Sequence, residues 1–171
     1  MAISRSSLVI LFNYQDFFMI RLSRLADYAV LLLKYLASQP KDSLICASAL
    51  ATACSLPEPT ASKVLKLLLR GNFLLSVRGT QGGYSLIRDA KEISIAEIIS
   101  CIDGPIALTD CMGNFESVCS IEENCATRHG WRKVNDAVEK ALAGIFLSDF
   151  LNQPNNLKAE TDFLAPRAKS V

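Results

Sequence analysis

The sequence has little net charge, a single histidine and no long apolar run near its N-terminus. Its 18 Lys and Arg residues almost balance 17 Asp and Glu residues, which leaves a net charge of +1. A protein with so small a charge has no global positive field, so any binding to nucleic acid depends on a local basic patch. One histidine in 171 residues, without a nucleotide-binding fingerprint or a recognisable acid–base pair, argues against an enzyme.

The apolar run nearest the N-terminus, residues 8–12, is too short to cross a bilayer. Polar residues follow it, whereas a secretory signal ends in small residues, so a signal peptide is the weaker alternative. We expect a cytoplasmic protein with no membrane contact, in which six cysteines serve as core residues, metal ligands or redox groups. Residues 1–18 are expected to be an N-terminal extension and residues 152–171 a flexible tail.

Half of the residues are hydrophobic, and apolar side chains recur at helical spacing in the first part of the chain. This pattern predicts a first helix over residues 21–38, with Ser23 as its cap. It predicts a short second helix over residues 44–54 and a third helix from Glu58 that ends at Gly71. Two short helices across a tight turn, packed on a first helix, form a helix-turn-helix.

The third helix has hydroxyl and cationic side chains near its N-terminal end. Recognition helices use this end to reach base edges and phosphates. We expect Thr60 and Ser62 near bases and Lys63 and Lys66 near phosphates. The solvated face of an ordinary helix would carry similar residues, and this helix considered alone favours that simpler interpretation.

A β-hairpin is predicted directly after the third helix, and it strengthens the case for DNA. Residues 73–77 and 84–87 predict two strands, joined by a glycine-rich turn. Such a tip lets the backbone approach DNA closely while Arg78 enters a minor groove. A phosphate cradle for a nucleotide is the alternative, but these glycines do not lead into a helix. The expected DNA contacts of this wing are Arg78, Gly79, Thr80, Gln81, Gly82 and Tyr84.

A second group of helices follows the hairpin. Residues 94–101 predict a short helix, so residues 19–104 are expected to form a winged helix-turn-helix domain of mainly α fold. A long amphipathic helix is predicted over residues 130–151. We expect it to pair with the same helix of a second subunit in a homodimer, the alternative being packing on its own domain. Its pairing face contains Trp131, Val134, Val138, Leu142 and Ile145.

Three of the six cysteines share a polar loop, residues 105–129, between these two parts. Cys111, Cys119 and Cys125 have the spacing C-x7-C-x5-C among glycine, asparagine, serine and glutamate residues. Thiolates in such a loop are accessible, and a soft metal centre favours them. The other cysteines lie in predicted helices, where we expect buried structural thiols. They are Cys46, Cys54 and Cys101.

Three chemistries suit the cysteine loop. Its wide spacing favours an iron–sulfur cluster, whose metal atoms spread their ligands apart. Zinc is an alternative, although its structural sites usually have a tight C-x2–4-C pair that is absent here. A thiol–disulfide switch is the third possibility. A cluster normally needs a fourth ligand, for which Asp27 and His129 are candidates, although both residues also suit ordinary surface positions.

Four segments together resemble the winged-helix iron–sulfur transcription regulators, the family that includes the Isc regulator and the nitric-oxide-sensing repressor. They are RLSRLADYAV (21–30), SVRGTQGGYSL (76–86), ISIAEIISCIDGPIALTDC (93–111) and the cysteine loop ending CATRHGW (125–131). The first segment and the phrase GPIALTDC look most like the branch that regulates SUF-system cluster assembly.

The resemblance implies a homodimer with two winged helices that controls cluster-assembly genes. We expect it to bind double-stranded DNA at a two-fold symmetric operator, as a repressor or as a regulator that both represses and activates. It also implies an iron–sulfur cluster on Cys111, Cys119 and Cys125, expected to be 2Fe–2S rather than 4Fe–4S. The alternatives are a winged-helix regulator with zinc or a thiol–disulfide switch, and an iron–sulfur or redox protein that does not bind DNA.

The resemblance leaves the fourth ligand open. The Isc regulator has a histidine ligand where this chain has Arg128, and His129 is the next residue. In the nitric oxide sensor, an aspartate from the other subunit completes the cluster, and Asp27 matches its position.

Overall fold

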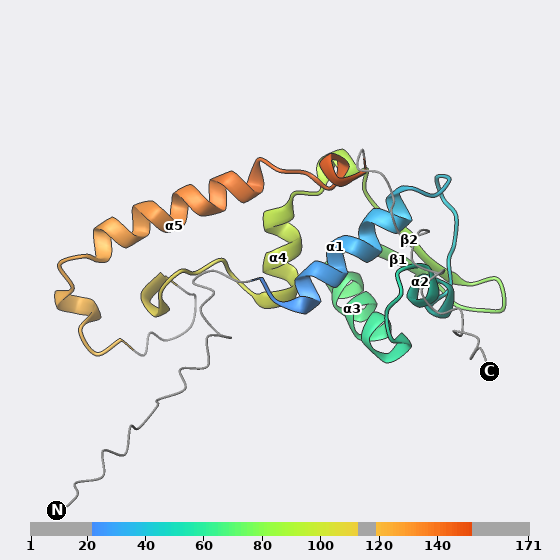
Figure 1. The fold of residues 1–171 in the computed structure, drawn as a ribbon, viewed down its shortest axis with the longest axis horizontal. Helices are drawn as coiled ribbons and strands as arrows, with labels where there is room; N and C mark the ends of the chain where they lie inside the picture. The colour runs from blue at the N-terminus through green and yellow to red at the C-terminus, as the bar shows by residue number, and fades with distance from the viewer. Residues whose placement is uncertain (1–21, 113–118, 152–171) are drawn as a thin grey trace, which may run out of the picture.

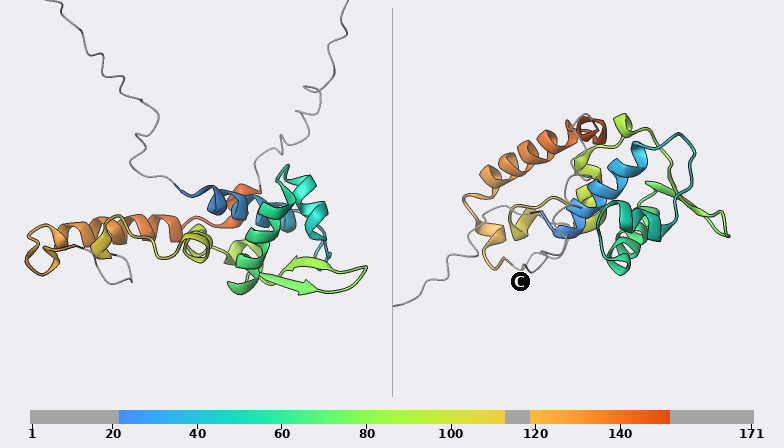
Figure 2. Two further views of the ribbon diagram at one scale, coloured as in Figure 1. Left: turned by 90° about the horizontal axis from the view of Figure 1, so that it is seen from below. Right: turned by 45° about the vertical axis from the view of Figure 1, so that its right-hand side comes forward.

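The structure, a computed structural model, describes residues 22–112 and 119–151 (Figure 1). Three helices, α1 to α3, and a two-stranded hairpin form a body, α4 lies beside them, and the long helix α5 extends away from the body (Figure 2). The predicted extension, residues 1–18, and the predicted tail, residues 152–171, lie outside the described residues. Of the helices described, none has both the length and the apolar character that a bilayer crossing needs.

Helix α1 (Arg24–Ala37) is the centre of the core. The Ser23 Oγ accepts a hydrogen bond from the Ala26 amide at 3.0 Å, which is the cap predicted from the sequence. The apolar spacing turns one face inward, and Leu32 and Leu33 are completely buried there. Each such leucine stabilises the fold by about 1.5–3 kcal/mol because it leaves water. Helices α3 and α4 both pack against α1.

Helices α2 (Ala47–Ala53) and α3 (Glu58–Arg70) form the predicted helix-turn-helix. The chain between them is held by the Leu56 amide, which donates to the Ala51 carbonyl at 2.9 Å. One face of α3 is buried against α1 and α2, which leaves the opposite face exposed. The buried residues of α3 are Ala61, Val64, Leu65 and Leu68.

Strands β1 (Leu74–Val77) and β2 (Gly83–Leu86) form the wing, an antiparallel hairpin directly after α3. Ile45 adds a second, short pairing on the other side of β2. Its amide donates to the Tyr84 carbonyl at 3.1 Å, and its carbonyl accepts from the Tyr84 amide at 2.9 Å. Glycine is required at position 83, since a Cβ there would lie 2.6 Å from the Ile45 backbone. This pairing excludes Ile45 from the second helix, so α2 begins at residue 47 and the predicted start at residue 44 is wrong.

Helix α4 (Ile95–Asp103) carries a capping box at its N-terminal end. The Glu97 amide donates to the Ser94 Oγ at 3.2 Å, and the Ser94 amide donates to the Glu97 carboxylate at 2.9 Å. Its apolar face packs on α1 and α3. Helix α5 packs against α4, and α4 in this way connects α5 to the body.

Helix α5 (Arg128–Ala143) ends before Gly144, so the predicted continuous helix over residues 130–151 is too long. The chain then returns to the body. The Ile95 amide donates to the Ile145 carbonyl at 2.9 Å, and the Leu147 amide donates to the carbonyl of residue 93 at the same distance. Leu147 is completely buried and begins the short 3-10 helix η4 (Leu147–Phe150). Helical spacing of apolar residues continues through the break, which is why the sequence pattern did not reveal it.

Candidate DNA interface and cysteine loop

The exposed face of α3 carries Lys63 and Lys66. Within the described residues, neither lysine makes a side-chain hydrogen bond or an ion pair. Uncommitted ammonium groups on a projecting helix can neutralise phosphates, which is the sequence-independent part of DNA binding. Thr60 and Ser62 are half-buried on the first turns of the same helix. The arrangement permits the predicted contacts, whose roles stay predictions.

The tip of the wing is a tight turn with Arg78 exposed beside it. Gly79 has a φ of 121°, which strongly favours glycine, and the Gly82 amide donates to the Gly79 carbonyl at 3.0 Å. The Arg78 guanidinium has no hydrogen-bond or ion-pair partner in the part of the chain that the structure describes. A narrow tip with an exposed cation suits insertion into a DNA groove. Of the other predicted wing contacts, Thr80 and Gln81 are exposed and Tyr84 is half-buried.

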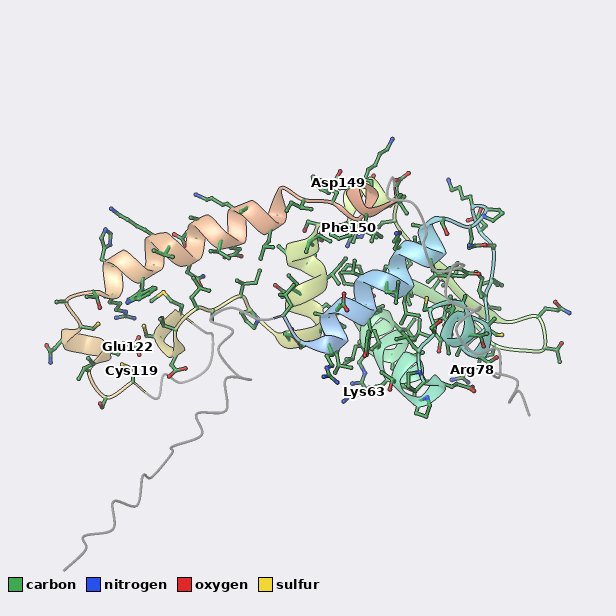
Figure 3. All side chains as sticks on the ribbon, viewed as in Figure 1. Lys63, Arg78, Cys119, Glu122, Asp149 and Phe150 are labelled. Atoms are coloured by element: carbon green, nitrogen blue, oxygen red, sulfur yellow. The ribbon has the colours of Figure 1, made fainter. Side chains whose placement is uncertain are left out.

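The α3 and wing cations lie at the opposite end of the molecule from the cysteine loop. Figure 3 shows Lys63 and Arg78 on the helix-turn-helix body, and Cys119 and Glu122 beside the N-terminal end of α5. Helix α5 spans this separation, because it packs on α4 at one end and on the segment around Cys111 at the other. The cysteine loop therefore does not lie beside the candidate DNA-binding surface of the same chain.

Short helical turns carry the three cysteines of the loop. Cys111 is in η2 (Asp110–Met112), and Cys125 directly follows η3 (Glu122–Asn124). Cys119 lies just before η3, and all three thiols are partly exposed. The loop thus offers thiols at the surface without burying them in the core.

The chemistry of these donors suits an iron–sulfur cluster, since cysteine thiolates are its usual protein ligands. The described geometry, however, does not gather them. In residues 22–112 and 119–151, no three His, Cys, Asp or Glu side chains lie together as a metal ion requires. Holding a cluster on these three thiols therefore requires them to lie closer together than they do in the described residues.

The two candidate fourth ligands are both exposed. His129 lies in the first turn of α5 and Asp27 in the first turn of α1. Arg128, the residue directly before His129, donates to the Glu122 carboxylate at 2.6 Å and so links α5 to η3. Within the described residues, the structure places neither His129 nor Asp27 in a group of three possible metal ligands.

Much of the apolar face of α5 is exposed in the single chain. Trp131 is 45% exposed and Val134 is 46% exposed, and Val138 is half-buried. Leu142 packs against the core instead, and Ile145 lies beyond the end of the helix. An apolar face on a projecting helix marks an interaction surface.

Asn135 is the residue of this region that the sequence analysis missed. It is only 6% exposed, although its neighbours on α5 are more accessible. Its Oδ1 accepts from the Leu108 amide and its Nδ2 donates to the Ile106 carbonyl, both at 3.0 Å. These bonds hold the segment that leads to Cys111 against α5. The signal was present, because Asn135 is a polar residue one turn after Trp131, on the apolar side of the helix.

The other three cysteines differ in their surroundings. Cys54 is buried as predicted, and burial raises the pKa of its thiol to about 11. Cys101 is only partly buried, and this burial also raises the pKa of its thiol. Cys46 is exposed, so its predicted burial is wrong. It is the N-cap residue just outside α2, where a hydrogen bond with the Ser48 hydroxyl and further backbone hydrogen bonds lower the pKa of its thiol.

At neutral pH, we expect an alkylating reagent to modify Cys125 at least about tenfold faster than Cys54 in the apo protein. Hydrogen bonds from the Thr127 hydroxyl and backbone lower the pKa of Cys125, so a larger fraction is the reactive thiolate. The raised pKa of Cys54, about 11, keeps its buried thiol protonated. Iodoacetamide labelling followed by peptide mass spectrometry measures both rates. Similar rates in the folded protein would contradict this expectation, and labelling in denaturant is the control.

The fold and these surfaces define a winged helix-turn-helix DNA-binding protein with a cysteine loop. A family model described as Rrf2, iron-dependent transcriptional regulator, matches residues 22–153. The chain belongs to the Rrf2 family, and it is a DNA-binding transcription regulator, not an enzyme.

Individual relatives support this assignment. A Mycobacterium tuberculosis protein whose name describes an HTH-type transcriptional regulator is 32% identical over 129 residues, 75% of this chain and 80% of its own. The HTH-type transcriptional regulator NsrR of Halalkalibacterium halodurans is 26% identical over 139 residues, 81% of this chain and 95% of its own. The solved structure of T. potens IscR has a TM-score of 0.57 and 26% identity, covering 77% of this chain and 86% of that one. The matches confirm the predicted family resemblance and the mainly helical winged fold.

Proposed function

We propose that the protein is an iron–sulfur cluster-sensing repressor of genes for SUF-type cluster assembly. One observation carries the proposal: a winged-helix protein of an iron-dependent family has three accessible thiols on one loop. We expect Cys111, Cys119 and Cys125 to hold the cluster as thiolates, and expect 2Fe–2S rather than 4Fe–4S. When bound, the cluster would connect these three thiolates, and this connection would be lost when iron is scarce or when oxidants destroy the cluster.

The fourth ligand in this proposal is either Asp27 or His129. His129 is exposed near the loop, one helical turn after Cys125. Asp27 is exposed on α1, in the body, so it would come from a second copy of the chain.

We propose that two copies pair through α5 about a two-fold axis. Pairing would bury the exposed face that contains Trp131 and Val134, and each Å² of apolar surface removed from water contributes roughly 25 cal/mol. The same axis would relate the two wings, so the operator is expected to be two-fold symmetric. DNA affinity would change if the two states of the loop hold α5, and hence the wings, in different positions.

The first test is the visible spectrum of protein purified anaerobically with iron and sulfide. A brown protein with charge-transfer bands supports the cluster, and a colourless protein after reconstitution refutes it. Asp27→Ala and His129→Ala are compared with wild type, and the variant that loses colour identifies the fourth ligand. Binding to duplex DNA is then measured with and without iron in wild type and in Cys111→Ala, where equal affinities in all cases would refute the switch.

A thiol–disulfide switch or a zinc site in the same winged-helix regulator is the second candidate. The lowered pKa of Cys125 favours the thiol switch, since a thiolate reacts with oxidants more readily than a thiol. Neither alternative absorbs in the visible, so the same spectrum separates them from a cluster. Mass spectrometry after mild oxidation, with zinc analysis, then distinguishes one from the other.

A further inference from the structure

We infer that Asn135 is a positioning residue that holds Cys111 in place by clamping the backbone of residues 106–108 to α5. The inference rests on the proposed function in one respect, namely that Cys111 is a ligand. The clamp itself is a property of the apo protein and does not depend on a bound cluster.

Both polar atoms of the Asn135 side chain are used by the clamp. Its Oδ1 accepts from the Leu108 amide, and its Nδ2 donates to the Ile106 carbonyl, each at 3.0 Å. The side chain is 6% exposed, so water does not readily replace these bonds. Both partners of Asn135 are backbone groups of residues 106–108. The clamp therefore fixes the backbone path of these residues.

The clamped segment leads directly to the proposed ligand. Cys111 follows Leu108 by three residues, in η2, and η2 packs on α5. Cys111 and Asn135 line the same groove, of about 510 Å³, which also includes Ser100 and Pro105. Removal of the clamp therefore frees the chain immediately before Cys111.

The clamp also connects this ligand to the helix that we propose pairs two copies. Asn135 is adjacent to Val134, which is 46% exposed on the apolar face of α5. A displacement of Cys111 would thus pull on α5 through the two hydrogen bonds between the Asn135 side chain and the backbone of residues 106–108. Cys125 is connected to α5 by another route, since it lies three residues before Arg128, the first residue of that helix.

The test compares Asn135→Ala with Lys133→Ala, an exposed position on the same helix, in the apo protein. In Asn135→Ala, the Leu108 amide is expected to exchange with solvent about tenfold faster than in wild type, because its acceptor is removed. Alkylation of Cys111 is expected to quicken about fivefold while the rate at Cys125 stays unchanged. Lys133→Ala is expected to match wild type in all three measurements. Unchanged exchange and unchanged Cys111 labelling in Asn135→Ala would overturn the inference.

Asn135→Asp separates the bond that the side chain donates from the bond that it accepts. A protonated aspartic acid can donate to the Ile106 carbonyl and accept from the Leu108 amide, whereas the ionised form cannot donate. Relative to wild type, we expect Cys111 labelling in this variant to be unchanged at acidic pH and to quicken at alkaline pH, where the donor to the Ile106 carbonyl is lost. The Leu108 amide is expected to stay protected in both forms, because either form of the carboxyl group accepts from it. Each comparison uses wild type at the same pH, because Cys111, Arg132, Asp136 and Glu139 also line the groove. Cys111 labelling that is independent of pH relative to wild type would overturn the part of the clamp that the bond to the Ile106 carbonyl provides.

The loaded protein provides a separate measurement. With a chelator present, the visible absorbance of Asn135→Ala is expected to decay about tenfold faster than that of wild type, and that of Lys133→Ala at the wild-type rate. A colourless wild-type protein would refute the proposed cluster but not the clamp. The exchange and labelling measurements on the apo protein would still show whether the clamp exists. A coloured wild type with equal decay in Asn135→Ala would overturn the role of Asn135 in holding the ligand.

Discussion

Replacing Lys63 and Arg78 together by alanine is expected to weaken binding to duplex DNA by about a hundredfold. An arginine that contacts bases contributes roughly 1–3 kcal/mol, and loss of a lysine at a phosphate weakens binding further on every sequence. Both side chains are exposed on the helix-turn-helix body, and neither has a partner within the described residues. Lysine on α3 can neutralise a phosphate, and arginine at the narrow wing tip can enter a groove. The effects of the two substitutions are therefore expected to combine.

Fluorescence anisotropy over a range of salt concentrations measures this effect, with a duplex that the wild-type protein selects from random DNA. The slope of log affinity against log salt is expected to fall by about 0.9 for each phosphate that the variant no longer neutralises. Lys133→Ala/Lys140→Ala is the matched control, because it removes the same charge from exposed positions on α5. Equal weakening in both double variants would mean that net charge alone matters, and would exclude α3 and the wing as the interface.

Leu147→Ala is expected to lower the free energy of unfolding by about 2–5 kcal/mol, the usual range for a leucine in a packed core. Leu147 is completely buried in the same core cluster as α1 and α4. Its side chain anchors the C-terminal end of α5 to the body, beside the hydrogen bond from its amide to the carbonyl of residue 93. Removing the side chain leaves a cavity and loosens this anchor.

Denaturation by urea, followed by circular dichroism, measures the change in stability. Leu75→Ala is the matched control, because Leu75 is 53% exposed on the wing and its truncation is expected to cost less than about 1 kcal/mol. Leu147→Met, which keeps most of the volume, is expected to fall between them. Equal stability of Leu147→Ala and Leu75→Ala would place Leu147 outside the core in solution.

Helix ends that depend on neighbouring residues were predictable from the sequence. Ser23 accepts from an amide three residues later, and Gly71 ends α3 as expected. The hairpin after α3 was likewise predicted from its strand residues and its glycine-rich turn. In each case the determining partners lie within a few positions in the sequence, so the pattern contains the physical cause.

The errors have the opposite origin. Ile45 has the spacing of a helix residue, but it pairs with Tyr84, a residue far along the chain. The pattern extended the last helix to residue 151, but bonds to residues 93 and 95 draw the chain away from a helical path. Cys46 was expected in the core because the predicted second helix included it. The observed helix α2 begins one residue after Cys46, which leaves this cysteine exposed. A residue that is distant in the sequence can override local helix propensity when it forms the backbone hydrogen bonds that a helix would otherwise form.

The sequence by itself determined which reactive and charged groups this protein has: three cysteines on a polar loop, lysines on the third helix and an arginine at a glycine-rich tip. These depend on residue types and short spacings, which are readable in order along the chain. The tertiary structure alone decided that the cations and the loop lie at opposite ends, and that Leu147 anchors the helix between them. It also decided that Asn135 holds a backbone segment 29 residues away, because such a bond exists only after folding brings the two segments together.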